Sequence, residues 1–583
     1  MPAAPLTERA RPDRRVTTSG GVLVTVWLLV LAGLLEWPIT RRGYLLAHDM
    51  VFTPHQPLDA ASFGISSAAP RAVPVDALVA MVEHVVDGAV VARVAVLVPL
   101  LGAGLGCAAL LARASLAGRI AAATAGVWNP FVVERLAIGQ WALLWSYAAL
   151  PWLVLAFRDT RRRRSWAIGA VALAAAAITP TGALIGGATA VIMAAVGRPG
   201  RRALLGVMGL ALAVQLPWLL PGLTSASAGT SDARAVAAFG PRAEHAGGSV
   251  LSLLGGGGIW DADVVPSSRG GPHAFVWLAV LVLAATFGWP RLRELLGARA
   301  VTGSAVAAAI GFVLAALPAV PGGGAVLRAT IDAVPGAGLL RDSQKWLVPF
   351  VVLEASLIGA ALDRAADLVR RRAGGAWPLT LLVIAAALPL VVLPDAPGTL
   401  RTPLRPVHYP RDWSAVARAL ASEPPRDAVV LPFAAYRSFP WAPGRTVLDP
   451  APRLLPVPTV VDDRLPVGGT VLRGENPRVR RVAAALASGP DLADALAAAH
   501  VGWVVVEHRT PGAVPALPGL QPVRHGADVS LYRVPGRVAP ERRSGAVTAV
   551  VLGGDAVAAL AVLAAIGYPL LRRRRGLRGP PTG

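Results

Sequence analysis

The stretch Gly20–Pro38, GGVLVTVWLLVLAGLLEWP, indicates how this chain of 583 residues begins to fold. It is an apolar run with the length of a membrane helix, which needs roughly 20 residues. Four arginines precede the run: Arg9, Arg11, Arg14 and Arg15. The run exceeds the core of a cleavable signal peptide, about 7–15 residues, and no small-residue cleavage site follows it. We therefore expect a signal anchor, with residues 1–19 as a cytoplasmic tail.

The composition of the whole chain is that of a membrane protein. Hydrophobic residues make up 54% and charged residues only 15%, whereas soluble domains average about 25% charged residues. The net charge of +22 would suggest a nucleic-acid partner in a soluble protein. Here the arginines lie in short clusters between apolar runs, as the positive-inside rule predicts for cytoplasmic loops. We therefore expect no nucleic-acid partner. Cys107 is the single cysteine, which excludes an intrachain disulfide and a cysteine-based metal site.

About twelve apolar segments are candidates for membrane spans. They lie near 20–39, 90–112, 119–131, 141–157, 166–179, 183–197, 203–220, 274–290, 300–318, 345–365, 376–395 and 546–571. The arginine clusters between them then fall on one side of the membrane, up to the basic tail 572–583. This pattern predicts a multi-pass protein of the inner (plasma) membrane, mainly α, with both termini in the cytoplasm. Its body is a helical bundle over residues 20–395, and 546–571 is the last span.

All long connections are predicted to lie outside the cytoplasm. The outer loops are 40–89, 221–273 and 319–344, and the segment 396–545 alternates helical patterns with strand-like runs. Such alternation predicts a small extracytoplasmic α/β domain before the last span. The glycine run Gly255–Gly258 lies in an outer loop, without the strand and helix of a nucleotide-binding fingerprint. Any chemistry is therefore expected outside the cytoplasm and without ATP.

The first outer segment carries an acid beside cations. Asp49 lies in the stretch YLLAHDMVFTP (44–54), next to His48 and shortly after Arg41 and Arg42. The two arginines are on the side where cations are disfavoured. They either extend toward lipid headgroups from the end of the first span or hold a lipid-linked phosphate. Asp49 is either a turn residue or a general base.

Two further outer segments carry unexpected polar groups. The stretch WNPFVVERLAIGQW (128–141) joins two short apolar segments, and GLLRDSQKW (338–346) precedes a later span. The candidate residues in these stretches are Asn129, Glu134, Arg135, Gln140, Arg341 and Lys345. Arginine matches phosphate because its planar fork donates two hydrogen bonds at once. These charges either pair within the bundle or line one outward-facing cavity together with Asp49.

These three stretches resemble the multi-spanning glycosyltransferases of the C class (GT-C), which use polyprenyl-phosphate sugars outside the cytoplasm. The nearest members are the actinobacterial arabinofuranosyl- and mannosyltransferases. A helical body followed by an outer domain and a last span also resembles YfhO-like membrane proteins. The resemblance implies Asp49 as the base of an inverting single displacement. The class often carries two acids in this loop, and this chain departs from that pattern because its next acid, Asp59, lies ten residues away.

The resemblance also implies partners for the other candidates. The donor is a polyprenyl-phosphate sugar held by the outer cations among membrane lipids, and the acceptor is an envelope glycan or glycolipid. The sequence contains no convincing set of metal ligands, so no metal or other cofactor is expected. Two alternatives use the same residues differently. The chain is either a transporter or flippase of a lipid-linked envelope intermediate, or a non-catalytic envelope assembly protein.

Overall fold

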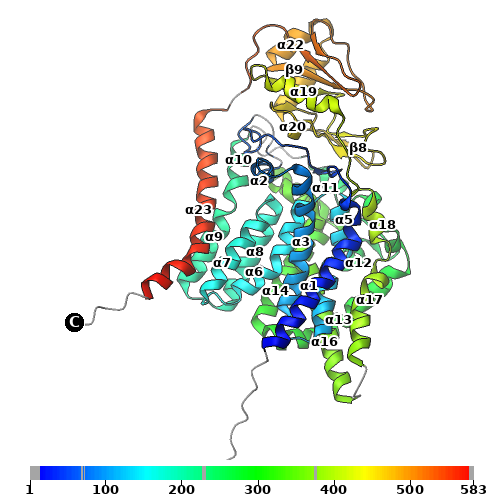
Figure 1. Cartoon of the computed structure of the whole chain (residues 1–583), viewed down its shortest axis with the longest axis vertical. Helices are drawn as coiled ribbons and strands as arrows, with labels where there is room; N and C mark the ends of the chain where they lie inside the picture. Colours follow the sequence, from blue (N-terminus) through cyan, green and yellow to red (C-terminus); the bar gives the residue numbers. More distant parts are fainter. Residues whose placement is uncertain are drawn as a thin grey trace, which may run out of the picture.

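The computed structural model describes residues 14–66, 70, 72–225, 232–372, 377–541 and 543–576. A helical bundle forms the body of the protein, and a smaller domain built on a β-sheet sits at one end of the bundle (Figure 1). The last helix runs back along the side of the bundle, away from this domain (Figure 1).

Among the described residues, seven helices are long and apolar enough to cross a membrane. They are built on α1 (Arg14–Glu36), α3 (Gly88–Leu110), α8 (Pro180–Gly197), α13 (Pro272–Leu296), α14 (Ala298–Ala316), α16 (Val348–Arg372) and α23 (Gly545–Gly576). An eighth span results if α9 (Arg201–Ala213) and α10 (Leu216–Thr224), bent by 50°, are counted together. The chain is therefore a mainly helical membrane protein, and the number of twelve spans stays a prediction.

The other predicted spans fall on shorter helices. These are α4 (Leu116–Val127), α6 (Trp141–Phe157), α7 (Arg163–Ala176) and α17 (Trp377–Val392), and the short helix α5 (Pro130–Ala137) lies in the stretch that joins α4 to α6. The helical structure is interrupted between α4 and α5 at Asn129. The side-chain oxygen of Asn129 accepts a hydrogen bond from the N–H of Val132 at 3.0 Å. Pro130 follows at the first position of α5. The N–H of a residue at this position makes no hydrogen bond within the helix, so proline, which lacks an N–H, is tolerated there. Short helices also occupy the loops predicted to lie outside: α2 (Val75–Glu83), α11 (Ala235–Ala238), α12 (Gly248–Leu254) and α15 (Gly323–Ala333). A further short helix, α18 (Ala396–Arg401), follows α17.

Glycines allow α16 to pack very closely against two neighbours. A Cβ atom on Gly359 of α16 would lie 2.6 Å from the carbonyl oxygen of Gly118 in α4. On another side of α16, a Cβ atom on Gly288 of α13 would lie 2.2 Å from the carbonyl oxygen of Leu357. Small residues at such crossings let helix backbones approach, which is how helices associate where the solvent is itself apolar. These contacts fix α16 at the centre of the bundle.

We expect Gly359→Ala to destabilise the bundle by about 1–3 kcal/mol, because the added methyl group forces α4 and α16 apart. The measurement is the thermal unfolding midpoint of the purified protein in detergent. Gly209→Ala in α9 is the matched control, since a Cβ atom there meets nothing within 4 Å. An equal midpoint for the two variants would contradict the close crossing.

Within residues 377–541, a sheet of five strands forms the core of the small domain. The strand order is β10-β11-β9-β3-β6. The strands are β3 (Asp427–Leu431), β6 (Thr459–Val460), β9 (Val501–Glu507), β10 (Gln521–Arg524) and β11 (Val529–Arg533). β3 pairs in parallel with β6 and β9, while β9, β11 and β10 pair antiparallel.

The two faces of this sheet are covered by different helices. Val430 and Trp503 pack on the face covered by α19 (Arg411–Ala421). Their neighbours Val429 and Val504 pack on the opposite face, against α21 (Pro477–Leu486) and α22 (Leu492–Ala498). Successive side chains of a strand point to opposite faces, so strands covered on both faces are apolar throughout. The domain limits 396–545 remain a prediction.

Candidate functional site

Asp49 lies at the turn of a short hairpin. The hairpin consists of β1 (Leu46–Ala47) and β2 (Met50–Val51), which leaves His48 and Asp49 as the two connecting residues. His48 has a φ angle of +47°. This left-handed conformation is uncommon for a residue with a side chain and turns the chain sharply. The carboxylate of Asp49 is thereby placed at the tip of the hairpin.

The small domain holds this tip by its backbone. A second hairpin, β4 (Tyr436–Arg437) with β5 (Val447–Leu448), lies against the first one. The N–H of His48 donates to the carbonyl oxygen of Thr446 at 2.7 Å, and the N–H of Leu448 donates to the carbonyl oxygen of His48 at 2.8 Å. These two bonds tie the turn to the small domain. They are the contacts that the structure shows for the predicted substrate-binding residue His48.

The helical bundle holds the tip from the other side. The N–H of Asp49 points to the carbonyl oxygen of Ile138 at 3.4 Å, just after the end of α5. Gly139 follows with a φ angle of +79°. A Cβ atom on Gly139 would lie 2.4 Å from both the carbonyl oxygen of Ala47 and the nitrogen of Met50. Only glycine fits this approach, and the turn between α5 and α6 is therefore docked directly on the Asp49 hairpin.

Two neutral donors hold the carboxylate of Asp49. The hydroxyl of Tyr436 donates to Oδ1 at 2.6 Å, and Nε2 of Gln140 donates to Oδ2 at 3.3 Å. Asp49 is half-buried. Neither donor carries a charge, and each carboxylate oxygen has a further lone pair. The site thus combines one predicted residue from the bundle, Gln140, with Tyr436 from the small domain, a residue that no sequence signal singled out.

A chain of polar contacts extends from Gln140 into the bundle. Nη1 of Arg135 donates to Oε1 of Gln140 at 2.5 Å. The guanidinium of Arg135 also donates two hydrogen bonds to the carboxylate of Asp342, from Nη1 to Oδ2 at 2.8 Å and from Nη2 to Oδ1 at 2.9 Å. Nζ of Lys345 lies 3.2 Å from Oδ2 of Asp342. The structure therefore joins Asp49, Gln140, Arg135 and Lys345, which come from all three outer segments.

Asp342 is the anion on which both cations converge. Burial raises the pKa of its carboxyl, but the positive charges of Arg135 and Lys345 outweigh this and bring the pKa below its usual range. Asp342 therefore stays ionised and neutralises the fully buried Arg135. Asp342 lies in the stretch 338–346 but is not among the predicted site residues, and its position three residues before Lys345 is the sequence signal that indicates its role.

Glu134 belongs to a second buried cluster beside Arg135. Its Oε2 accepts a hydrogen bond from Nε2 of Gln344 at 3.0 Å. Burial and the nearby carboxylate of Glu244 raise the pKa of Glu134 well above its usual value, against the opposing charge of Arg269. Arg269 itself pairs with Glu244, with 2.8 Å between Nε and Oε2. The raised pKa of Glu134 favours its protonated form.

We expect Glu134→Gln to make the protein less sensitive to alkaline pH. A carboxyl whose pKa is raised in the folded state adds stability below its unfolded pKa, near 4.3, and that stability is lost as pH rises toward the folded value. Glutamine keeps a neutral donor and cannot ionise. The melting temperature of the wild type should fall relative to the variant as pH is raised from about 5 to about 9.

The exposed acid Asp332 supplies the control for this measurement. Asp332→Asn should leave the pH dependence of the melting temperature unchanged. Parallel curves for the wild type and Glu134→Gln would contradict the buried, protonated state of Glu134.

Arg41 and Arg42 lie apart from this network. Both side chains are exposed at the end of the first span. The guanidinium of Arg41 lies 5.7 Å from the ring centre of Trp37, and Arg401 approaches the same ring at 5.9 Å. The structure shows no contact between these arginines and Asp49 among the described residues. Arg41 and Arg401 thus form a separate basic group around Trp37, at the end of the bundle that carries the small domain.

Two other predicted residues have structural partners. Arg341 pairs with Glu475 of the small domain at 3.0 Å and lies 5.6 Å from the ring centre of Phe239. Asn129 caps α5 and also contacts the hydroxyl of Tyr147 at 3.2 Å. Arg341 therefore links the bundle to the small domain, and Asn129 shapes the turn before Glu134.

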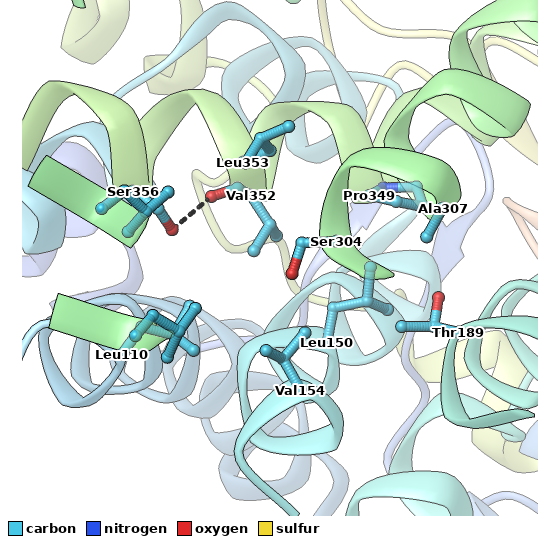
Figure 2. A pocket seen from close by; sticks show the side chains of 12 residues that line it. Leu110, Leu150, Val154, Thr189, Ser304, Ala307, Pro349, Val352, Leu353 and Ser356 are labelled. Atoms are coloured by element: carbon cyan, nitrogen blue, oxygen red, sulfur yellow. Dashed lines mark hydrogen bonds between the residues drawn. The ribbon is translucent and has the colours of Figure 1, made fainter. Parts of the chain in front are cut away.

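The described residues also contain an apolar cavity inside the bundle. Side chains of α3, α6, α8, α13, α14 and α16 line it (Figure 2). Its hydroxyls bond to their own helices, as Ser356 does to the carbonyl oxygen of Val352 at 2.9 Å (Figure 2). No residue of the Asp49 network lines this cavity. Among all the residues that the structure describes, no group of three or more His, Cys, Asp or Glu residues is arranged to hold a metal ion.

Comparison with solved structures finds membrane glycosyltransferases. The cryo-EM structure of the arabinofuranosyltransferase AftD from Mycobacteria matches with a TM-score of 0.55 and 17% identity, over 91% of this chain and 40% of that one. A mutant form of the same enzyme gives 0.54 and 19%, over 91% and 42%. The crystal structure of the Archaeoglobus fulgidus oligosaccharyltransferase gives 0.43 and 11%, over 85% and 69%.

These matches concern the fold. No protein-family model matches the chain, and no curated protein matches it. The chain spans about two fifths of the length of AftD. At this level of identity, the predicted resemblance to glycosyltransferases of the C class is confirmed for the fold.

Proposed function

We propose that this membrane protein is a glycosyltransferase that moves a sugar from a polyprenyl-phosphate donor to an envelope glycan or glycolipid. The fold shared with AftD supports the class of enzyme. The observation that carries the proposal is the setting of Asp49: a half-exposed carboxylate at a hairpin tip, where the bundle and the small domain meet. A base must reach a substrate hydroxyl, and the buried acids Asp342 and Glu134 are committed to partners inside the protein.

In the proposed step, Asp49 accepts the proton of an acceptor hydroxyl. The acceptor oxygen forms a bond to the anomeric carbon of the sugar, while the bond from that carbon to the phosphate oxygen breaks. The polyprenyl phosphate leaves with the electron pair, and a single displacement inverts the anomeric centre. Gln140 and Tyr436 hold the carboxylate in place by hydrogen bonds. They are positioning residues in this scheme.

The leaving phosphate requires positive charge. Lys345 keeps part of its side chain exposed while it contacts Asp342, and Arg41 and Arg42 are exposed at the membrane border. We assign charge stabilisation to Lys345, which belongs to the Asp49 network through Asp342, because a fixed cation aimed at developing negative charge lowers the barrier of such a transfer. Arg41 and Arg42 lie apart from that network and are not assigned this role. Arg135 has a different role, since both of its arms are bound to Asp342. It holds Gln140, and through it Asp49.

Asp49→Asn should lower sugar transfer by about 10²–10⁴-fold, which is the usual contribution of a general base. The assay uses membranes that contain the wild type or the variant, supplied with radiolabelled polyprenyl-phosphate arabinose or mannose. The readout is label transferred to the glycan and glycolipid fractions. Asp59→Asn is the matched control, because Asp59 belongs to the same outer segment but its carboxylate accepts from Ser62 at 3.0 Å.

Each outcome of this assay has a defined meaning. Loss of transfer in Asp49→Asn alone, at equal protein level, supports the enzyme and its base together. If the wild type transfers neither sugar and cells that carry only Asp49→Asn have a normal envelope, the catalytic proposal is wrong. Transport or assembly of a lipid-linked intermediate then becomes the better account of this fold.

Tyr436→Phe should lower kcat by about tenfold and leave KM nearly unchanged, because it removes a hydrogen bond to the charged base and no contact to substrate. Tyr409→Phe is the control: its hydroxyl donates to the carbonyl oxygen of Phe52 at 3.1 Å, in the same region of the interface. An increase of KM with constant kcat in Tyr436→Phe would show that Tyr436 binds substrate instead of positioning Asp49.

A further inference from the structure

A second cavity, which is polar, lies beside the last helix and is lined by residues far in sequence from the Asp49 segment. It has a volume of about 310 Å³ and is formed where the end of α10, the start of α21 and the start of α23 meet. Ligand cavities usually have volumes of about 300–1,000 Å³. Its polar lining includes Thr224, Asn476, Arg481, Arg543 and Ser544. None of the residues assigned to sugar transfer lines it.

The lining carries an excess of positive charge. Arg478, Arg481 and Arg543 face the cavity together with one acid, Glu541. Glu541 lies 2.8 Å from Nε of Arg478 and 3.0 Å from Nη2 of Arg481. Arg478 is also paired with Asp427 at 2.6 Å, outside the cavity lining. Glu541 is thus shared as the ion-pair partner of Arg478 and Arg481.

Arg543 is the cation without an acid of its own. Its Nη1 donates to the carbonyl oxygen of Thr224 at 2.9 Å, and over residues 232–541 and 543–576 the structure shows no ion pair for it. Arg481 is about half exposed, with 51% of its side chain accessible. Two guanidinium groups whose other donors have no partner in the part of the chain that the structure describes therefore face the same cavity, beside hydroxyl and amide groups. Guanidinium groups of this kind match the oxygens of a phosphate.

The position of the cavity indicates where the phosphate comes from. The candidate span Gly545–Gly567 begins two residues after Arg543, and Val547 of that span lines the cavity. Leu223, at the end of α10, is 62% exposed, and Val550, in the first turns of α23, is 49% exposed. Apolar side chains that are exposed on membrane helices face lipid tails. The cavity thus opens at the level of lipid headgroups, directly above a lipid-facing surface.

We propose that this cavity binds the phosphate of an anionic membrane lipid, in the leaflet on the side of the small domain. The lipid would bridge α10, α21 and α23, which joins the last helix and the small domain to the bundle. The site is separate from the Asp49 network and does not depend on sugar transfer.

The test measures lipid binding by native mass spectrometry of the intact protein in detergent, titrated with phosphatidylglycerol. The double variant Arg481→Gln and Arg543→Gln should bind the tightest lipid at least about tenfold more weakly, since it loses charge-assisted hydrogen bonds. Arg480→Gln is the matched control, because Arg480 is an exposed neighbour on the same helix that does not line the cavity. Equal melting temperatures show that the variants are folded.

Three outcomes would overturn the proposal. The double variant binds phosphatidylglycerol as the wild type does, or Arg480→Gln weakens binding equally, or inorganic phosphate alone displaces the lipid. The last result would assign the cavity to a free phosphate. Asp49→Asn should bind the lipid like the wild type, so that failure of the lipid site and failure of the proposed transferase can be told apart.

Discussion

The buried guanidinium of Arg135 is the constraint on which the site depends. A charge taken out of water costs several kcal/mol unless an ion of opposite charge and further hydrogen bonds replace the water. Asp342 provides both, because its two oxygens accept from both arms of the guanidinium. This planar pairing fixes the distance and the orientation between α5 and the segment before α16. Gln140 then transmits the position of Arg135 to Asp49.

The small domain contacts the Asp49 hairpin on the side opposite the bundle. It bonds to the backbone of His48 and supplies the hydroxyl of Tyr436 to the carboxylate of Asp49. Arg341 adds an ion pair to Glu475 across the same boundary. A domain that only covered the bundle would not need to contact the turn of the Asp49 hairpin. The proposed site is therefore shared between the two parts of the protein.

Three acids of the outer region have different properties because their surroundings differ. Two cations keep Asp342 ionised, whereas burial beside Glu244 keeps a proton on Glu134. Asp49 is half-exposed and is held by neutral donors. The first two acids serve the architecture of the bundle. This division of roles supports Asp49 as the acid that meets a substrate.

The sequence by itself determined the class of protein and the places where charge is unusual. Apolar runs such as Gly20–Pro38 show a membrane helix directly, because the thickness of the bilayer imposes their length. Similarly, the strand-like runs noted within 396–545 indicate a sheet, and one of its strands is β9 (Val501–Glu507). Short helices such as α4 and α7 do not have the length of a span. Packing against other helices places them, and this packing cannot be read from the length of an apolar run.

Only the tertiary structure decided which of these charges meet. Arg135, Gln140 and Lys345 were recognisable in the sequence because placing polar or charged side chains at the border of the membrane costs free energy, so that they are rare there. Asp342, the partner of Arg135 and Lys345, lies 207 residues from Arg135, and Tyr436 lies 387 residues from Asp49. Arg41 and Asn129 looked equally suited to the site and lie elsewhere. Composition and periodicity are local properties of a chain, whereas a hydrogen bond depends on the relative position of segments that only the packed bundle brings together.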